Sequence, residues 1–250
     1  MTTSLMRNTE EASPIAIGEL VGAVQALYGE SLRAVVQFGS AVAGELLPGQ
    51  SDTNLLIIVD AVPLSSLLHK AEAVQKWTAA GNPPPLLLTL AEWRSSSDIF
   101  AMEYADILHR HKVLIGDPPF EGVAVSPRDL RLHVEREAMG KLLQLRRAVM
   151  AVGNEPKLLL RLLENGLSTL MVIFRGVSRV AGDSPSVDYV KLSQQVATRA
   201  GFDARPFERL VQHARREVQI PASDVNAVLT GVLDAMGRLV AFLDRAGGSA

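Results

Sequence analysis

The stretch AVVQFGSAVAGELLPGQSDTNLLIIVD, residues 34–60, decides the fold class of this chain. It reads as an apolar strand, a Gly-Ser turn, a loop, and a Ser-Asp pair that opens a second apolar strand. Side chains at positions i and i+2 of a strand point to the same face. We therefore expect Asp52 and Asn54 to project together into one cleft beside the glycine turn.

The spacing of these residues suits phosphoryl transfer. Two carboxylates one residue apart at the start of a strand can hold two Mg²⁺ ions, which bridge an attacking oxygen and a nucleoside triphosphate during in-line displacement. Gly39 and Ser40 let the backbone come close to phosphate oxygens, and a following helix would offer N–H groups and its positive dipole end. Here the first acidic position holds Asp52, whereas the second holds the neutral amide Asn54.

With this arrangement, the chain resembles the polymerase-beta-like nucleotidyltransferase superfamily, and within it the small bacterial branch of aminoglycoside adenylyltransferases. The matching residues are Gly39, Ser40, Gly44, Ser51, Asp52 and the apolar run 55–59. Weaker support comes from the segment 113–118, VLIGDP, and from the helical C-terminal half. The resemblance implies an α/β N-terminal nucleotidyltransferase-like domain, with a small mixed sheet and flanking helices, followed by an all-α C-terminal bundle.

The same resemblance implies roles for individual residues. Asp52 and Asn54 take the catalytic and metal-binding positions, of which Asn54 is the degraded one. Gly39, Ser40 and Ser51 take the nucleotide-binding positions. An active site of this kind would use Mg²⁺ and a nucleoside triphosphate, whereas an inactive one would need neither.

Active members of the superfamily carry a third acid on a neighbouring strand. We expect that strand at 86–90, which reads LLLTL and has Thr89 as its one polar residue. Glu92 lies just past the strand and is either a displaced third ligand or a residue that complements the dipole of a following helix. Asp60 shares the strand face of Asp52, but eight residues place it about 26 Å away. It therefore cannot share the same ion.

Two functional hypotheses follow from the missing carboxylates at the expected metal positions. The favoured one is a catalytically impaired protein that acts as a nucleotide-binding or protein-interaction module, because two of the three metal positions lack charge. The segment 41–43 reads AVA, without the Arg that many active relatives use to hold triphosphate. The alternative is an active Mg-dependent nucleotidyltransferase that transfers NMP from an NTP to a small-molecule or protein hydroxyl, with Glu135 or Glu137 as the general base by position in the resembled enzymes.

Composition narrows the class of protein further. A chain of 250 residues with 48% hydrophobic content can bury one large core or two modest ones and is not a disordered protein. The chain has no cysteine, which excludes disulfides and thiolate metal sites. It shows no uncharged apolar stretch of about 18 residues, and residues 1–13 are polar, unlike an export signal. We expect a cytoplasmic protein without a membrane span, and the oligomeric state stays open.

The distribution of charge and a Pro- and Gly-rich segment divide the chain into two expected domains, 1–120 and 121–250. The first has seven basic and thirteen acidic residues, a balance of −6, and the second has eighteen and fourteen, a balance of +4. Either the basic half meets phosphate at a cleft, or the two domains pair through complementary faces. A balance of +4 is too small to argue for nucleic-acid binding.

Apolar periodicity predicts the order of the elements. Helices are expected at 15–28, 64–80 and 98–110, and strands at 32–38, 53–59, 86–90 and 112–115. After the Pro- and Gly-rich boundary at 118–127, the chain reads as helices at 127–151, 156–181, 187–200, 204–218 and 223–245. Ser126 and Ser223 are expected to cap the first and last of these helices.

Two further residue pairs have spacings found in functional sites. Arg128 and His133 form Arg-x4-His, a spacing found in ribonucleases built on the HEPN helical bundle, but they lie at the entrance of a helix, and chance spacing is the preferred explanation. His109 and His111 lie near Asp106 and suggest a metal site. Residues two apart on a helix do not face each other, so a polar helix end is preferred.

Overall fold

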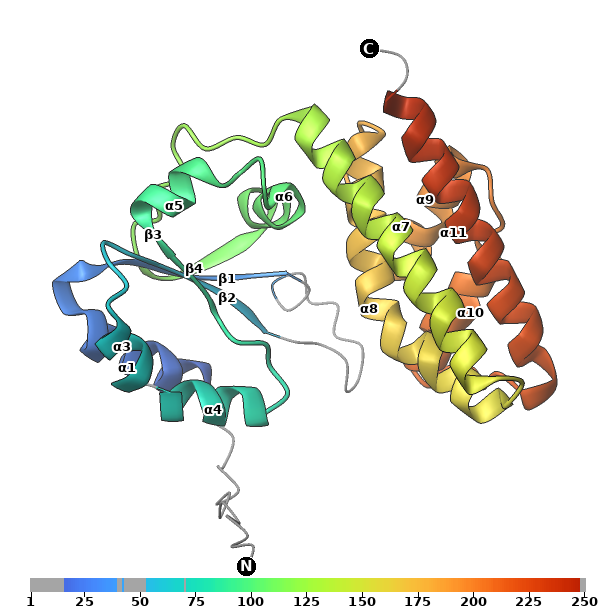
Figure 1. The fold of residues 1–250 in the computed structure, drawn as a ribbon, viewed down its shortest axis with the longest axis horizontal. Helices are drawn as coiled ribbons and strands as arrows, with labels where there is room; N and C mark the ends of the chain where they lie inside the picture. Colours follow the sequence, from blue (N-terminus) through green and yellow to red (C-terminus); the bar gives the residue numbers. More distant parts are fainter. Residues whose placement is uncertain (1–15, 40–41, 43–52, 70, 248–250) are drawn as a thin grey trace, which may run out of the picture. The chain divides into compact units, whose positions relative to one another are not determined.

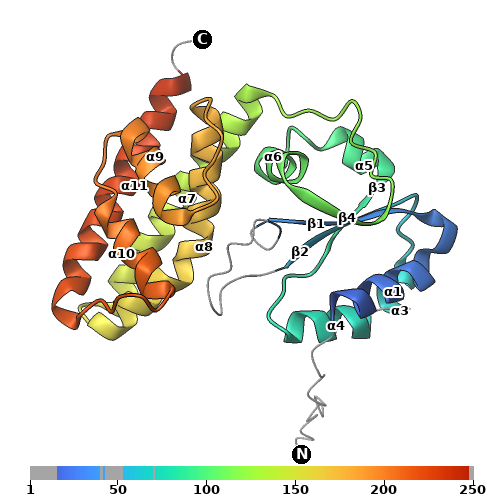
Figure 2. The same cartoon turned by 180° about the vertical axis from the view of Figure 1, so that it is seen from behind.

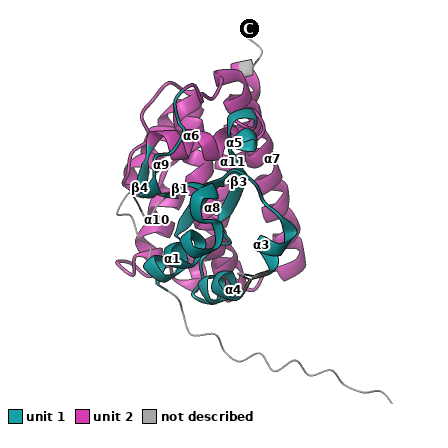
Figure 3. Ribbon diagram, turned by 90° about the vertical axis from the view of Figure 1, so that its left-hand side faces the viewer, with its two compact units in different colours: residues 1–42, 52–95, 110–121 teal, residues 43–51, 96–109, 122–250 magenta. Residues whose placement is uncertain are grey.

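The computed structural model describes residues 16–39, 42, 53–69 and 71–247. Ser40, Gly44, Ser51 and Asp52 therefore lie outside the described residues. The chain divides into two compact units, shown in Figure 3, which comprise residues 1–42, 52–95 and 110–121, and residues 43–51, 96–109 and 122–250. Compared with the expected division at residue 120, the segment 96–109 belongs to the second, helical unit.

The first unit contains a small mixed sheet of four strands (Figure 1). The strand order is β3-β2-β1-β4, in which β1 is antiparallel to β2 and β4, whereas β2 and β3 are parallel. The strands are β1 Leu32–Phe38, β2 Asn54–Val59, β3 Leu86–Thr89 and β4 His111–Gly116. The expected combination of α-helices with a small mixed β-sheet is confirmed.

Helices cover both faces of this sheet. Figure 2 shows α1 and α4 on one face and α5 on the other. The helices of the first unit are α1 Ile17–Tyr28, a 3-10 turn at Gly29–Ser31, α3 Leu64–His69, α4 Ala71–Ala79 and α5 Leu90–Ser95. The region expected as one helix at 64–80 contains α3 and α4, on either side of residue 70, which lies outside the described residues, and the short helix α5 was not among the helices predicted from periodicity.

The core of the first unit lies on the α1 and α4 side of the sheet. Alternate residues of β2, with Ile57 at their centre, pack against Leu20 and Val24 of α1 and against Trp77 of α4. The other set of alternate residues, Asn54, Leu56 and Ile58, points to the opposite face. Asn54 is the polar residue at the beginning of this second set.

The second unit is helical. It contains α6 Ala101–His109, α7 Pro127–Val152, α8 Pro156–Val180, α9 Tyr189–Ala200, α10 Arg205–Ala214, a 3-10 turn at Ala222–Asp224 and α11 Val225–Gly247. Ser126 caps α7, because its hydroxyl accepts a hydrogen bond from the Asp129 N–H at 3.0 Å. Ser223 lies inside the 3-10 turn, so its expected role as the cap of α11 is wrong.

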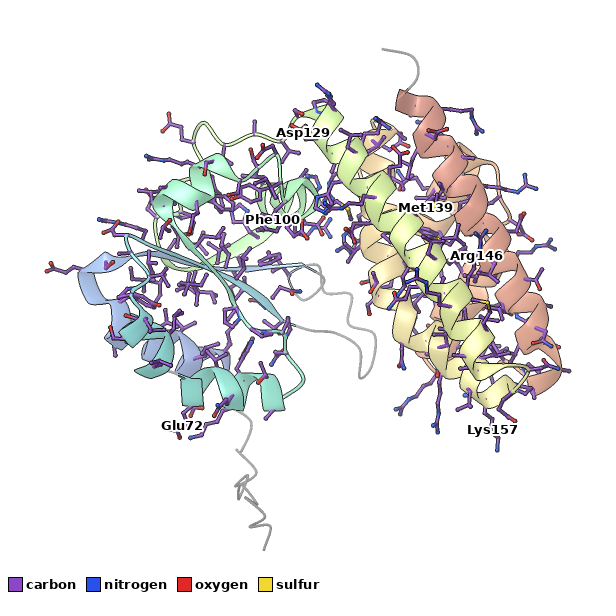
Figure 4. All side chains as sticks on the ribbon, in the orientation of Figure 1. Glu72, Phe100, Asp129, Met139, Arg146 and Lys157 are labelled. Atoms are coloured by element: carbon purple, nitrogen blue, oxygen red, sulfur yellow. The ribbon has the colours of Figure 1, made fainter. Side chains whose placement is uncertain are left out.

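The bundle core forms mainly between α7, α8 and α11, where leucines such as Leu142, Leu163 and Leu239 are buried. The outer faces remain exposed: Met139 and Arg146 lie on the exposed side of α7, and Lys157 extends from the first turn of α8 (Figure 4). Within the described residues, Ala222–Ala246 is the helix long and apolar enough to cross a membrane, and 39% of its most apolar window is buried in the protein. That composition is shared by core helices of water-soluble proteins.

Candidate functional site

The structure brings Gly39 and Asn54 together at one edge of the sheet. Phe38, the last residue of β1, pairs with Asn54, the first residue of β2. Gly39 follows with φ of +82°, a left-handed conformation that favours glycine. A Cβ atom added there would lie 2.9 Å from the Asn54 Nδ2 atom. The glycine therefore lets the backbone lie against the side-chain amide of Asn54.

The next described residue, Val42, hydrogen-bonds back to Gly39. The Val42 N–H donates to the Gly39 carbonyl at 3.3 Å. Of the five predicted site residues, Gly39 and Asn54 are described, whereas Ser40, Ser51 and Asp52 lie in the part of the chain that the structure does not describe.

The start of β2 is held in place by Asn82, a residue that sequence reasoning missed. The Thr53 N–H donates to the Asn82 Oδ1 atom at 3.0 Å, and the Asn82 Nδ2 group donates to the Trp77 carbonyl at 3.4 Å. Asn82 thus links α4 to the residue that precedes Asn54. The available signal was the tripeptide Gly-Asn-Pro at 81–83, because Asn in a turn commonly hydrogen-bonds nearby backbone.

Strand β3 supplies the neighbouring face of the candidate site. In the parallel register, Leu86 pairs with Leu56 and Leu88 pairs with Ile58. Paired residues share a face, so Leu86 and Leu88 lie on the same side of the sheet as Asn54. Both leucines are half-buried and neither can bind a cation. Across the described residues, no group of three His, Cys, Asp or Glu side chains is placed to hold a metal ion.

Glu92 caps a helix. Thr89 is the last residue of β3 and the residue before α5. Its N–H donates to the Glu92 Oε2 atom at 2.7 Å, and the Glu92 N–H donates to the Thr89 hydroxyl at 3.2 Å. This reciprocal pair is a capping box. The backbone N–H of Thr89, followed by its hydroxyl, lowers the pKa of Glu92. Of the two interpretations of Glu92, the structure supports the one that places it at a helix start.

We predict that Thr89→Ala destabilises the first unit by about 1 kcal/mol, because the side-chain cap of α5 is lost. The measurement is urea unfolding followed by tryptophan fluorescence, since Trp77 and Trp93, the two tryptophans of the chain, both lie in this unit. Thr78→Ala in α4 is the matched control and should change stability by less than about 0.5 kcal/mol. Equal effects of the two substitutions would rule out the capping role.

Asp60 forms a salt bridge with Arg33. Its carboxylate accepts hydrogen bonds from the Arg33 guanidinium, one of them from Nε at 2.6 Å. The Arg33 hydrogen bond lowers the pKa of Asp60. Asp60 directly follows β2, at the end opposite to Asn54. It is therefore remote from the candidate site, as predicted.

In the second unit, His133 lies between two carboxylates. The side chain is 8% exposed, and its Nδ1 atom accepts a hydrogen bond from the Met102 N–H at 3.4 Å. Glu103 Oε2 lies 3.9 Å from Nδ1, and Glu137 Oε1 lies 3.8 Å from Nε2. Burial raises the pKa of Glu103, although its own backbone hydrogen bond and His133 act against this. Sequence reasoning missed Glu103, because its packing on α7 is a tertiary contact.

The other residues considered from the sequence are dispersed. Arg128 is exposed, whereas His133 is buried, and five residues of helix separate their directions by about 140°. Glu135 pairs with Arg131 at 2.6 Å, and Arg131 also donates to the Leu243 carbonyl. Glu137 accepts a hydrogen bond from the Arg136 guanidinium at 3.3 Å, so both candidate bases are paired with an arginine.

The two histidines near the end of α6 have different surroundings. His109 is the last residue of α6 in the helical unit. His111 begins β4 in the first unit, where its ring packs edge-on against Phe120 with 4.7 Å between ring centroids. These positions agree with the preferred explanation of a polar helix end, with His111 packed against an aromatic ring.

A buried ion-pair network ties α6 to α8. Asp106 accepts hydrogen bonds from Arg175 at 2.8 Å and lies 2.5 Å from a nitrogen of Arg179. The three side chains are only 12–14% exposed. Burial acts to raise the pKa of Asp106, but the two guanidinium charges outweigh it, so the pKa is lowered. The network stabilises the helical unit.

No family model matches this chain, and no curated protein matches its sequence. The structure alone shows a protein of two units, one of them α/β and the other helical. Its candidate site combines a left-handed glycine with a strand-opening asparagine.

Proposed function

We propose that this chain is a nucleotidyltransferase-like protein whose metal site is degraded, and that it acts as a nucleotide-binding or interaction module in the cytoplasm. The proposal joins the sequence resemblance to the geometry of the sheet edge. Gly39 and Asn54 lie side by side there, in the positions that the resemblance assigns to nucleotide and metal.

One observation carries the proposal. On the face of the sheet where a metal pair would be held, β2 offers Asn54 and β3 offers Leu86 and Leu88. Two Mg²⁺ ions bring four positive charges, and Mg²⁺ is normally held through carboxylates and substrate phosphates. A neutral amide and two leucines provide no compensating charge, so Asp52 would be the one remaining acid of the resembled set.

The missing negative charge should impair catalysis more than nucleotide binding. Enzymes accelerate phosphoryl transfer chiefly by stabilising the charge that develops in the transition state, and the metal ions supply much of that stabilisation. Binding of the nucleotide depends less on them, because backbone N–H groups beside Gly39 would still meet phosphate oxygens. A module that binds nucleotide weakly without transferring it is the consequence.

An active Mg-dependent nucleotidyltransferase is the second candidate. It is favoured by the retained Asp52 and by the intact glycine contact with Asn54, whose carbonyl oxygen is a neutral Mg²⁺ ligand. By position in the resembled enzymes, Glu135 or Glu137 would be its general base.

Isothermal titration calorimetry of the unmodified chain with ATP tests the proposal. We predict weak or no heat of binding, with little change between buffers with and without Mg²⁺. Asn54→Asp should introduce a clear dependence on Mg²⁺, because it restores the second carboxylate. Asn54→Ser is the neutral control and should behave like the unmodified chain. Nucleotide transfer by the unmodified chain onto any acceptor would defeat the proposal.

A further inference from the structure

An apolar cavity of about 370 Å³ lies in the first unit, lined by α1, α3, α4 and the sheet. Ile57 of β2 and Leu87 of β3 form its floor, and Val24 of α1 and Val74 of α4 line its sides. Ile57 and Leu87 are directly paired, so the floor is continuous sheet. The volume falls within the range of about 300–1,000 Å³ that is typical of small-molecule sites.

One wall of the cavity is stiff and anchored. Pro84 and Pro85 form it, and their rings fix the backbone φ angles. The preceding residue, Pro83, accepts a hydrogen bond at 2.8 Å from the indole N–H of Trp77, which is 2% exposed. The wall is therefore held to α4 by the protein itself. A site that is already formed before binding loses little free energy to ordering.

The described lining of the cavity carries no charge. None of the eleven described residues around the cavity is acidic or basic, and the polar ones are Tyr28, Ser66 and Gln75. A charged ligand would lose its hydration and find no counter-charge, which is strongly unfavourable. Burial raises the pKa of the Tyr28 phenol, in keeping with apolar surroundings. The cavity thus selects for a neutral molecule with few polar groups.

We propose that this cavity is a binding site for a small, neutral, apolar molecule that carries one polar group, which Tyr28, Ser66 or Gln75 hydrogen-bonds. Leu67 of α3 stands at the entrance, since it lines the cavity and is still 48% exposed. The cavity is on the face of the sheet opposite to Asn54, so the site does not depend on the proposed nucleotide function.

Occupancy of the cavity should affect the start of β2. The wall segment at Pro83–Pro85 directly follows Asn82, whose side-chain Oδ1 atom accepts a hydrogen bond from the Thr53 N–H. A ligand that restrains the wall should therefore protect the Thr53 amide against hydrogen exchange. This connects the cavity to the residue that precedes Asn54.

The test is a fluorescence titration of the full chain with the neutral apolar dye N-phenylnaphthylamine. We expect saturable one-to-one binding with blue-shifted emission and slower exchange of the Thr53 amide. Leu67→Asp should weaken binding by about tenfold or more, because it places a carboxylate at the apolar entrance. Leu68→Asp is the matched control: Leu68 is 67% exposed and does not line the cavity, so binding should change by less than about twofold.

A second variant tests the cavity through its effect on stability. Ser66→Phe fills the cavity, so it should abolish dye binding and raise the melting temperature. Three results would each overturn the proposal: no saturable binding, an equal loss in Leu67→Asp and Leu68→Asp, or a concentration-dependent dimer that Leu67→Asp dissociates in sedimentation. The second result would mean that the dye adheres to the exposed leucines of α3, and the third that a second copy of the chain occupies the cavity.

Discussion

Combining Asn54→Asp with Leu86→Glu should give Mg-dependent ATP binding about a hundredfold tighter than that of the unmodified chain, at roughly tenfold for each restored carboxylate. Leu86 is chosen because it pairs with Leu56 on β2, two residues along the same face from Asn54. The longer Glu side chain reaches toward the strand end, and the position is half-buried, so a carboxylate there keeps access to water.

The matched control is Asn54→Asp with Leu86→Gln, which has the same shape and one charge fewer. It should gain the tenfold of the single Asn54→Asp variant and no more. Calorimetry with and without Mg²⁺ measures both variants. If the double variant binds ATP no better than the unmodified chain, the loss of charge on this face is not what limits metal binding.

Asp106→Asn should destabilise the helical unit by about 3–5 kcal/mol, since it leaves Arg175 and Arg179 buried without their counter-charge. The unfolding of this unit can be followed by far-ultraviolet circular dichroism, while tryptophan fluorescence reports the first unit separately. Asp234→Asn is the matched control, because it breaks the exposed ion pair with Arg238. It should cost less than about 1 kcal/mol, and equal losses in the two variants would contradict the role of the buried network.

The pH dependence of stability follows from the same network. The folded-state pKa of Asp106 is lowered, so its contribution is fully present above the unfolded-state pKa of about 3.9 and is lost as the pH falls below it, toward the folded-state pKa. The unmodified chain should therefore lose more unfolding free energy between pH 7 and pH 3 than Asp106→Asn does. Parallel curves for the two proteins would exclude Asp106 as a source of acid sensitivity.

The elements of the fold could be predicted largely from local pattern. The apolar runs gave β1 to β4 within two residues at each end, and the helices of the second unit begin at the predicted residues or within three of them. The short helix α5 was missed because its six residues are too few for periodicity and its start depends on the Thr89 and Glu92 cap. The membership of 96–109 in the helical unit was also missed, because tertiary packing decides it.

The candidate site was predictable in part. The apolar runs placed Gly39 at the end of one strand and Asn54 near the start of the next, but the antiparallel pairing that brings the two residues into contact came from the structure. Asn82 and the pairing of Leu86 with Leu56 depend on how β3 docks beside β2, and strand pairing is not encoded in either segment alone. The network of Asp106 joins residues 69 positions apart, which no short motif reveals.

Crystals of the unmodified protein soaked with ATP and Mn²⁺ provide the most direct measurement. The central claim is that this sheet edge lacks the charge to gather two divalent cations. The account predicts no pair of anomalous Mn²⁺ peaks beside Asn54, and a pair in the variant that combines Asn54→Asp with Leu86→Glu. Two peaks about 4 Å apart beside Asn54 in the unmodified protein, bridging the triphosphate, would contradict it.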